Sequence, residues 1–441
     1  MPRKTLLTFL GNSHYQKCRY ENQDRRFRSP VVRFVQEAVV EMHCRDWCAD
    51  DRILVFLTDE AEKNNWLGAI YPGEEEGLKN RLWQMKLKAA IEEITGVPKG
   101  FSEAEIWQIF ELFFNKMEEG DEVYFDITHG FRSLPMLGMV LMNYAKALKG
   151  IKVKAITYGA FDALGSRFNI EERIPDPEQR IVPLLDLTGF HELQEWSIAA
   201  DNFVKSGNTA KMIALTEGKT APMVHSAKET SPPLEALKLL SKNLNQLSGI
   251  MATNRGNEIM AGKTFDHIAE NLAAISKNPK VIPALQPILD KLQQKLKNFN
   301  QQMPNWISAV QWCIDHDLIQ QGITQLQEGL LTHFCNIDNN GFIELDPANE
   351  THRTLMSQAI LIGQKGIDLK DWYDPAAQNV EIINMVLKNE TIQQLLAPYE
   401  SLTWLRNDIN HGGFLSEKPL ESFRLELVEK FNEIKVILAI K

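Results

Sequence analysis

Hydrophobic and polar positions follow two different periods along this chain, and the change falls near Phe190. Before it, short apolar runs rich in β-branched and aromatic residues alternate with longer segments whose apolar positions recur every three or four residues. Short runs of this kind are typical of buried strands, and the longer segments of amphipathic helices. We expect strands at residues 5–10, 53–57 and 153–158, and in the stretch that opens at Glu122.

Helices are expected between these strands, each covering one face of the sheet. Ser102 is a good amino-terminal cap for one of them, with Glu103 and Glu105 placed to favour the helix dipole. Gly120 and Gly150 follow two of the helical patterns and mark their ends. The expected ranges are 30–43, 75–94, 102–117 and 134–148.

The remaining parts of this region are less regular. The polar, basic segment 20–28 is predicted to form a hairpin or a mobile flap, and prolines interrupt the pattern at 174–177 and 182–183. The order strand, helix, strand implies right-handed crossovers between parallel strands. The sequence therefore predicts an α/β fold here, a Rossmann-like parallel sheet of at least four strands over residues 1–190.

Downstream of Phe190 we find only helical patterns. Apolar stripes recur at 196–203, 234–250, 288–299 and 420–440, whereas 220–233 and 336–349 are turn-rich and are predicted to be exposed loops. No repeat of fixed period occurs. We expect residues 191–441 to form an all-α region of one or two domains.

Composition narrows the class of protein. The 441 residues are 44% hydrophobic and 24% charged, and the formal net charge is −10, which argues against a broad basic groove for duplex DNA but not against a small RNA site. The five cysteines are odd in number and scattered, so reduced thiols fit better than zinc ligands. No signal peptide and no span of membrane length is found, and we expect a cytoplasmic protein.

The stretch from Glu122 to Ser133 is the main candidate for chemistry. It joins a strand to a helix by a short polar turn, the place where ligands bind in α/β sheets. Thr128 and Ser133 offer hydroxyls there, His129 and Arg132 can meet phosphate, and Gly130 allows close approach of a ligand. An ordinary strand-to-helix connection with a capping Thr explains the same local pattern equally well.

Two further loops end at the same predicted edge of the sheet. Gly11, Asn12 and Ser13 follow the first strand and form either a phosphate-binding turn or a plain one. Tyr158 and Gly159 end a later strand. Because the carboxyl ends of parallel strands share one edge, the three loops are expected to face one crevice.

The residues Asp126-Ile127-Thr128-His129-Gly130 resemble the Asp-x-Thr-His-Gly signature of CRISPR-associated proteins built on a CARF (CRISPR-associated Rossmann fold) domain. Phe131, Arg132 and Ser133, together with 158–160, 187–188 and 195–197, look like the same family. The likeness is strongest over residues 1–210. It implies a cyclic oligoadenylate as ligand, with tetra-adenylate our first choice and hexa-adenylate our second, bound at Gly11, Asn12, Ser13, Thr128, His129, Gly130, Phe131, Arg132, Tyr158 and Gly159.

A second motif lies near the carboxyl end. Leu402, Leu405 and Ile409 mark the buried stripe of a helix that carries Arg406 and is ended by Gly412-Gly413. Arg406 and His411 lie about 140° apart on an ideal helix, so they meet only if the end unwinds or a second copy completes the site. From these residues alone, a cation that stabilises a helix end remains an open alternative.

This motif resembles the Arg-x4-His signature of HEPN ribonucleases, including the polar residue directly after the arginine, Asn407. The resemblance implies a homodimer, or a higher assembly built from it, in which two helices form one composite site without a metal. His411 would exchange protons, Arg406 would stabilise charge on phosphorus, and Asn407 would orient the phosphate. The implied function is a cyclic oligoadenylate-activated, metal-independent endoribonuclease that cuts single-stranded RNA in type III CRISPR antiviral defence.

Three other classes of protein are alternatives to a ribonuclease. A nicotinamide-dependent enzyme would carry Gly-x-Gly-x-x-Gly after its first strand, whereas Gly11-Asn12-Ser13-His14 stands here. A metal nuclease would cluster carboxylates beside its histidine, whereas Asp408 is isolated. A non-enzymatic nucleotide sensor that acts through a partner or DNA is the remaining alternative, although no basic helix-turn-helix is evident. We expect no cofactor and no resident metal.

Overall fold

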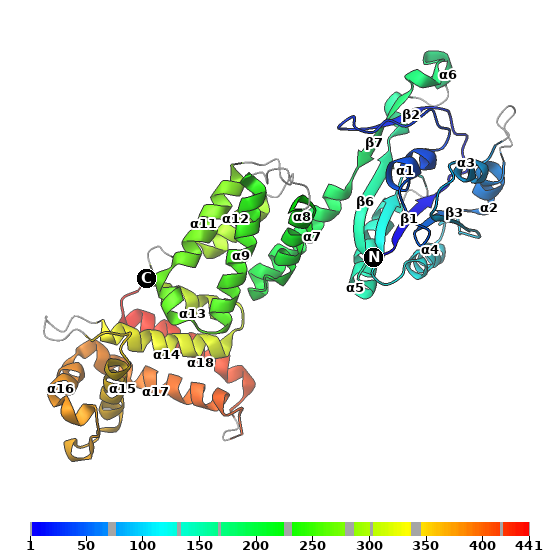
Figure 1. Ribbon diagram of the computed structural model, residues 1–441. Helices are drawn as coiled ribbons and strands as arrows, with labels where there is room; N and C mark the ends of the chain where they lie inside the picture. The colour runs from blue at the N-terminus through cyan, green and yellow to red at the C-terminus, as the bar shows by residue number, and fades with distance from the viewer. Residues whose placement is uncertain are drawn as a thin grey trace. The chain divides into compact units, whose positions relative to one another are not determined.

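The structure is a computed structural model that describes residues 2–68, 76–129, 134–165, 169–224, 232–277, 286–299, 303–336, 345–414 and 418–440 (Figure 1). The chain forms two compact units, Met1–Glu192 and Leu193–Lys441. Sheet and helices build the first unit, and the described part of the second unit contains helices only. The predicted combination of an α/β region followed by an all-α region is confirmed.

The first unit is built on a seven-stranded sheet with the order β2-β7-β6-β5-β1-β3-β4. All neighbouring strands are parallel except β6 and β7, which are antiparallel. The chain therefore builds β1, β3 and β4 outward in one direction and then places β5 and β6 on the other side of β1. The strands are β1 Lys4–Phe9, β2 Arg19–Asn22, β3 Arg52–Phe56, β4 Ala90–Ile94, β5 Glu122–Asp126, β6 Lys152–Gly159 and β7 Ile181–Asp186.

Helices cover both faces of this sheet, and each face has its own hydrophobic core. Alternate residues of β1 divide between the two cores: Leu6 packs with α1 and α3, whereas Leu7 and Phe9 pack with α4 and α5. Gly138 of α5 lets that helix approach the sheet, since a Cβ there would lie 2.4 Å from Phe125. The helices are α1 Val35–His43, α2 Asp59–Ala61, the π-helix η1 Glu62–Trp66, α3 Leu78–Gln84, α4 Glu103–Lys116, α5 Leu134–Lys149, the 3₁₀ turns η2 Phe161–Leu164 and η4 Pro177–Gln179, and α6 Ile170–Arg173.

The expected caps and strand ends are present, but one long helix was predicted wrongly. Ser102 caps α4 by accepting a hydrogen bond from the backbone N–H of Glu105 at 3.2 Å. Residues 75–94 do not form one helix, because α3 stops at Gln84 and Lys86 takes a left-handed backbone conformation. β4 follows as an edge strand beside β3, where charged side chains such as Glu93 are tolerated because one side of the strand is unpaired.

The proline-containing segment 181–186 is a strand, which the sequence reading missed. β7 pairs with β6 in the antiparallel sense and with β2 in the parallel sense, so the sheet is not purely parallel as predicted. Pro183 has no N–H to donate, but its carbonyl accepts a hydrogen bond from Ala160 N at 2.9 Å. Proline disfavours a strand because it lacks the backbone N–H, which is why the pattern predicted an interruption here. Its carbonyl can still accept a hydrogen bond within the sheet.

The second unit has two helical cores that share α13. Trp312 of α13 packs with α7 to α12, while Trp306 and Val310 of the same helix pack with α14 to α18. α8 runs to Val224 and α9 begins at Pro232, so the loop predicted at 220–233 is wrong at its helical ends and otherwise outside the described residues. The helices are α7 Thr188–Ser206, α8 Ala210–Val224, α9 Pro232–Ala252, α10 Gly256–Ala261, α11 Lys263–Ser276, α12 Gln286–Leu296, α13 Asn305–Asp315, α14 Ile319–Cys335, α15 Glu350–Lys365, η5 Leu369–Asp371, η6 Ala376–Gln378, α16 Val380–Lys388, α17 Glu390–Asn410 and α18 Leu420–Ile437.

None of the helices in the described ranges is both long and apolar enough to cross a membrane.

Candidate functional site

The order of strands in the first unit creates one natural place for a ligand. β1 lies between β5 and β3, and the chain leaves it in opposite directions on its two sides. Above the carboxyl ends of two such strands the connecting loops separate and leave a crevice. The loop after β1 holds Gly11, Asn12 and Ser13, and the loop after β5 holds Thr128 and His129.

Asp126, at the end of β5, organises the loop that follows it. Its carboxylate is fully buried and accepts hydrogen bonds from the hydroxyl of Thr8 at 2.7 Å and from the backbone N–H of Thr128 at 3.0 Å. The Thr128 hydroxyl donates to the same carboxylate at 2.5 Å and accepts from the backbone N–H of Gly159 at 2.8 Å. Asp126 therefore ties the ends of β1, β5 and β6 together.

These hydrogen bonds determine the roles of Thr128 and Asp126. The only proton of the Thr128 hydroxyl is used on Asp126, so this side chain holds the loop rather than donating to a ligand. Burial raises the pKa of the Asp126 carboxyl, against the opposing effect of its bonds from Thr128 and Thr8. A carboxylate enclosed in this way has no open side from which to take a proton from a substrate.

The loop after β1 is fixed against the loop after β5. The backbone N–H of Gly11 donates to the Tyr15 hydroxyl at 2.7 Å, and the Tyr15 ring lies edge-on to the His129 ring at 4.7 Å. Asn65 donates to the carbonyl oxygens of Gly11 and Ser13 at 2.9 and 3.0 Å. A side chain at position 11 would collide with Tyr15, so glycine is required at this contact.

The three predicted loops therefore meet, as expected. Gly159 completes the set, because a Cβ there would lie within 3.4 Å of Val35, Tyr20 and Thr128. Tyr158 is half-buried and faces Leu185 across the β6–β7 pair. Asn12 points to Glu60, which accepts from its amide at 2.8 Å. Gly130, Phe131, Arg132 and Ser133 lie outside the described residues.

Sequence reasoning missed several residues that line this edge. A narrow cavity of about 20 Å³ beside His129 is lined by His14, Tyr15, Gln16, Tyr20, Arg33 and Phe161. Arg33 is buried, and its guanidinium lies 4.9 Å from the centre of the Phe34 ring. Only the position of Tyr15 and Gln16 just after the first strand could have drawn attention to them.

The second motif ends α17 in the other unit. Leu402 and Leu405 are fully buried, and Ile409 packs against the same core, which confirms the predicted stripe. His411 is the carboxyl-terminal cap, its backbone N–H donating to the Asn407 carbonyl at 2.9 Å. Gly412 and Gly413, predicted to end the helix, both have positive φ angles, 66° and 72°.

Arg406 is held in place by a carboxylate from another helix. Its Nη1 donates to Oε1 of Glu328 on α14 at 2.9 Å. Oε2 of Glu328 accepts from Arg353 of α15 at 2.6 Å, so one carboxylate bridges two guanidinium groups. Glu328 lies 78 positions before Arg406, and no spacing in the sequence marks it.

Three buried polar atoms on α14 and α17 lack partners in the described part of the chain. Among the described residues, Arg406 Nε, Asp408 Oδ1 and Gln327 Oε1 are buried and have no hydrogen-bond partner. Groups of this kind are rare in folded proteins and call for a partner such as water, a ligand or another chain. Asn407 and His411 are exposed on the same helix end, and within the described ranges the His411 imidazole makes no hydrogen bond.

Two large apolar side chains flank this helix end in solvent. Trp404 is 66% exposed and Phe414 is 93% exposed. Beneath the motif, burial and then the negative charge of Glu328 raise the pKa of Tyr399 to about 12, so its hydroxyl stays protonated. The structure holds no group of three or more His, Cys, Asp or Glu residues in its described ranges that could bind a metal ion.

Comparison with known protein families finds a match for most of the first unit. Residues 5–162 match the family model described as "CRISPR system endoribonuclease Csx1, CARF domain". This is a CARF match. It spans β1 to β6 and both crevice loops, so the predicted CARF likeness is confirmed for this part of the chain.

Other comparisons concern the rest of the chain. Residues 192–309 match the model "CRISPR-associated protein MJ1674, second domain", which ends within α13. The "CRISPR-associated protein MJ1674" of Methanocaldococcus jannaschii is 26% identical over 245 residues, 54% of this chain, and the match spans about a third of the relative's length (33%). A solved structure, "Enterococcus italicus Csm6 bound to cyclic hexa-2'-fluoro-hexa-dAMP", aligns at 12% identity with a TM-score of 0.46, over 99% of this chain and 94% of that one.

Proposed function

We propose that this protein is a metal-independent endoribonuclease for single-stranded RNA, switched on by a cyclic oligoadenylate in type III CRISPR antiviral defence in the cytoplasm. The first unit is the sensor and the second carries a HEPN-type nuclease site. The observation that carries the nuclease assignment is the end of α17, where Arg406 is fixed by Glu328 while Asn407 and His411 stand in solvent.

The chemistry follows from these groups. His411 exchanges a proton with the ribose 2′-hydroxyl that attacks phosphorus, or with the 5′-oxygen that leaves. Arg406 stabilises the charge that develops on the phosphorane through its guanidinium, which Glu328 holds in place. Asn407 orients the phosphate through its exposed amide. The ribose hydroxyl is the nucleophile, so the reaction needs no metal-bound water.

A second copy of the chain completes the site. Arg406 and His411 project from different sides of one helix end, and Trp404 and Phe414 beside them offer apolar surface for a partner. In a two-fold dimer the same surface meets itself, so the His411 of one copy is brought toward the Arg406 of the other. The exposed Asn407 and His411 fit a site that is unfinished in one chain.

A dimer of the sensor is supported independently. Four apolar residues of α5, spaced four apart, are exposed along one side of the helix: Met136, Val140, Tyr144 and Leu148. A continuous exposed apolar stripe of this kind marks an interaction surface. α5 starts directly after the loop that carries His129, so pairing along this stripe involves the same helix as the crevice.

The activator is proposed to be a cyclic oligoadenylate, because the crevice lies in the part of the chain that matches a CARF domain. A ring with two-fold symmetry suits two identical crevices that meet at a dimer axis. Tetra-adenylate is our first choice and hexa-adenylate our second. His129 and Arg132 supply cationic or hydrogen-bonding contacts to phosphate, and Gly130 lets the ring approach the backbone.

One observation favours a second function. The pair of Arg406 with Glu328 is also what a purely structural tie between two helices would look like, which suits a non-enzymatic sensor that acts through a partner. Incubation with fluorescent single-stranded RNA, EDTA and each cyclic oligoadenylate in turn separates the two. We expect cleavage only when an activator is added, and EDTA should not prevent it. Absence of cleavage with every ring would favour the sensor.

A further inference from the structure

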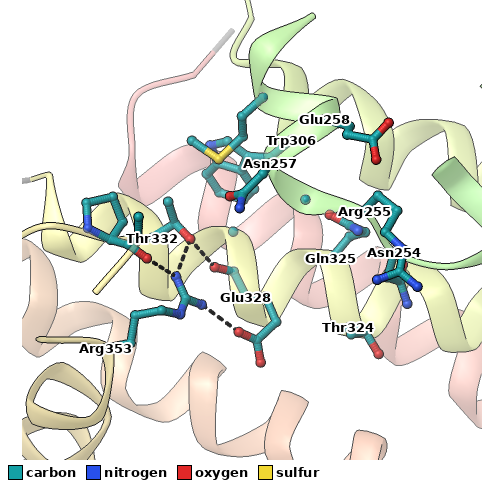
Figure 2. Close-up of a pocket in the computed structure, with 15 residues that line it drawn as sticks. Asn254, Arg255, Asn257, Glu258, Trp306, Thr324, Gln325, Glu328, Thr332 and Arg353 are labelled. Atoms are coloured by element: carbon teal, nitrogen blue, oxygen red, sulfur yellow. Dashed lines mark hydrogen bonds and ion pairs between the residues drawn. The ribbon is translucent and has the colours of Figure 1, made fainter. Parts of the chain in front are cut away.

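A cavity of the second unit adjoins the Arg406 site from the other side of Glu328. It has a volume of about 480 Å³, within the range of small-molecule sites. α14 forms its floor, the start of α10 and the start of α15 form two walls, and Trp306 of α13 closes one end (Figure 2). Glu328 lines this cavity and also holds Arg406, so the two sites share one side chain.

The rigid side of the cavity is built around Arg353. Its guanidinium donates to Glu328, to the Thr332 hydroxyl at 2.8 Å and to the Pro347 carbonyl at 3.3 Å, the bonds drawn in Figure 2. Gly329 lets the Trp306 indole lie directly on α14, since a Cβ there would be 2.4 Å from the ring. The cavity therefore has a fixed apolar end and a fixed polar wall.

Two carboxamides in this cavity lack the partners that buried amides normally have. Gln325 is 4% exposed and lines the cavity, yet its amide makes no hydrogen bond with any described residue. Figure 2 shows it reaching from α14 toward the segment that carries Asn254 and Arg255. The Oδ1 atom of Asn254 is buried and also without a partner in the described chain. A buried amide oxygen such as that of Asn254 is costly to leave without a partner.

The ligand chemistry follows from these groups. A carboxamide offers one acceptor and two donors side by side, the pattern that pairs with the edge of a nucleobase. Arg255 at the rim uses its Nε on Thr253 and keeps its other nitrogens available for a phosphate. Single-stranded RNA is recognised through bases that leave the stack and enter pockets with polar groups at their edges.

We propose that this cavity is a subsite for one unstacked nucleobase of the RNA substrate, read by Gln325 and Asn254, with Arg255 on the adjoining phosphate. This inference rests on the proposed ribonuclease function. The shared Glu328 places the base next to the phosphate that Arg406 contacts. The subsite fixes which phosphodiester reaches His411, so it gives the enzyme a base preference near the cut.

The test measures RNA binding in the full-length protein with His411→Ala, so that no substrate is cut. Fluorescence anisotropy is recorded with four labelled homopolymer RNAs in the presence of the activator. Adding Arg255→Ala should weaken binding of all four about tenfold, because it removes a phosphate contact common to them. Adding Gln325→Leu should instead reduce the differences in affinity among the four, because only the base-reading group is lost.

Matched controls keep the result specific. Arg424→Ala removes an exposed arginine of the same unit that pairs with Asp317, and Gln311→Leu removes an amide that pairs with Asp315; neither lines the cavity. Both should bind the four RNAs as the His411→Ala protein does. The melting temperature of Gln325→Leu should be unchanged or higher, since no hydrogen bond is broken.

The outcomes separate this inference from the proposed function. Equal affinities in the Arg255→Ala, Gln325→Leu and His411→Ala proteins would overturn the subsite and leave the nuclease intact. A fall in the melting temperature of Gln325→Leu would overturn it too, because the amide would then be structural. If RNA binds with the predicted pattern but the parent never cuts it, the ribonuclease assignment is wrong and the base subsite is supported. If no RNA binds, both fall.

Discussion

The crevice of the first unit and the end of α17 differ in how their central side chains are held. In the crevice, Asp126 accepts three hydrogen bonds, and Asn65 fixes the loop after β1 with two more. At the end of α17, buried polar atoms of Arg406 and Asp408 have no partner in the described chain, and His411 stands in solvent. The described part of the first site is held together by hydrogen bonds around Asp126, whereas His411 of the second site is exposed.

This difference explains how one could control the other. In the proposed function, the first site is formed within one chain, whereas the second site depends on a partner chain to complete it. An activator acts only if it binds one arrangement of the dimer more tightly than another. The account therefore predicts that substitutions in the crevice change the activator concentration that is needed, whereas substitutions at α17 change the rate that is reached.

The largest effect is expected for His411→Ala. Loss of the proton-transfer group should lower the rate of RNA cleavage about 10²- to 10⁴-fold, while the activator binds as it does to the parent. Cleavage of labelled RNA and calorimetry with the activator measure the two quantities. His267→Ala, an exposed histidine in the same unit, is the control, and parental cleavage by His411→Ala would remove the HEPN assignment.

His129→Ala and Arg132→Ala should have the opposite profile. Each removes a contact to phosphate worth about 1.5 to 3 kcal/mol, which raises the dissociation constant of the activator roughly ten- to a hundredfold. The cleavage rate at saturating activator should stay at the parental value. Arg45→Ala, which removes an arginine that pairs outside the crevice, is the control. Unchanged activator affinity in both variants would place the ligand elsewhere.

Glu328→Gln tests whether the bridge positions Arg406. The amide keeps the shape but loses the charge that holds two guanidinium groups, so we expect a cleavage rate about tenfold lower with unchanged activator affinity. The matched control is Glu400→Gln. Glu400 lies on α17, the helix that carries Arg406, and pairs with Lys365 of α15. A parental rate in Glu328→Gln would mean that Arg406 needs no support from α14.

Asp126→Asn should have the smallest effect, about 1 kcal/mol in the free energy of unfolding or a modest loss of activator affinity. Because the folded pKa of Asp126 lies above its usual value of 3.8, the buried charge destabilises the folded state as pH rises through that range. The parent should therefore lose stability relative to the variant as pH rises from below 3.8, and denaturant titrations across pH measure the difference. Asp126→Asn should still cut RNA at saturating activator, and failure to do so would contradict the structural role of Asp126.

Much of the crevice could be predicted because its signals are local. Gly11 and Thr128 closely follow strands and Gly159 ends one, and the common edge of parallel strands brings them together without further information. The stripe of Leu402 and Leu405 was also predictable, because helical periodicity is a local signal. β7 was missed because pairing with β6 outweighs the presence of Pro183, and the helix expected at 75–94 was wrong because edge pairing with β3 outweighs the local helical period.

What could not be predicted depends on contacts between distant residues. Glu328 acquires its role only when α14 packs against α17, and Gln325 is recognisable as unpaired only once its surroundings are known. The sequence does not distinguish Tyr15 from other aromatic residues that follow a strand. Its role depends on the hydrogen bond that its hydroxyl accepts from the backbone N–H of Gly11. Sequence periodicity tells which face of a helix is buried but not which polar groups remain without partners there.

Mixing of subunits tests most directly whether the α17 site is completed by a second copy. Parent and His411→Ala protein are combined in varying proportions at constant total concentration, allowed to exchange, and assayed on RNA with saturating activator and EDTA. If both copies are needed, activity falls with the square of the parental fraction, to about a quarter at an equal mixture. A linear fall to about one half would contradict a single site that needs His411 from both copies, and loss of all activity with EDTA would contradict a metal-independent site.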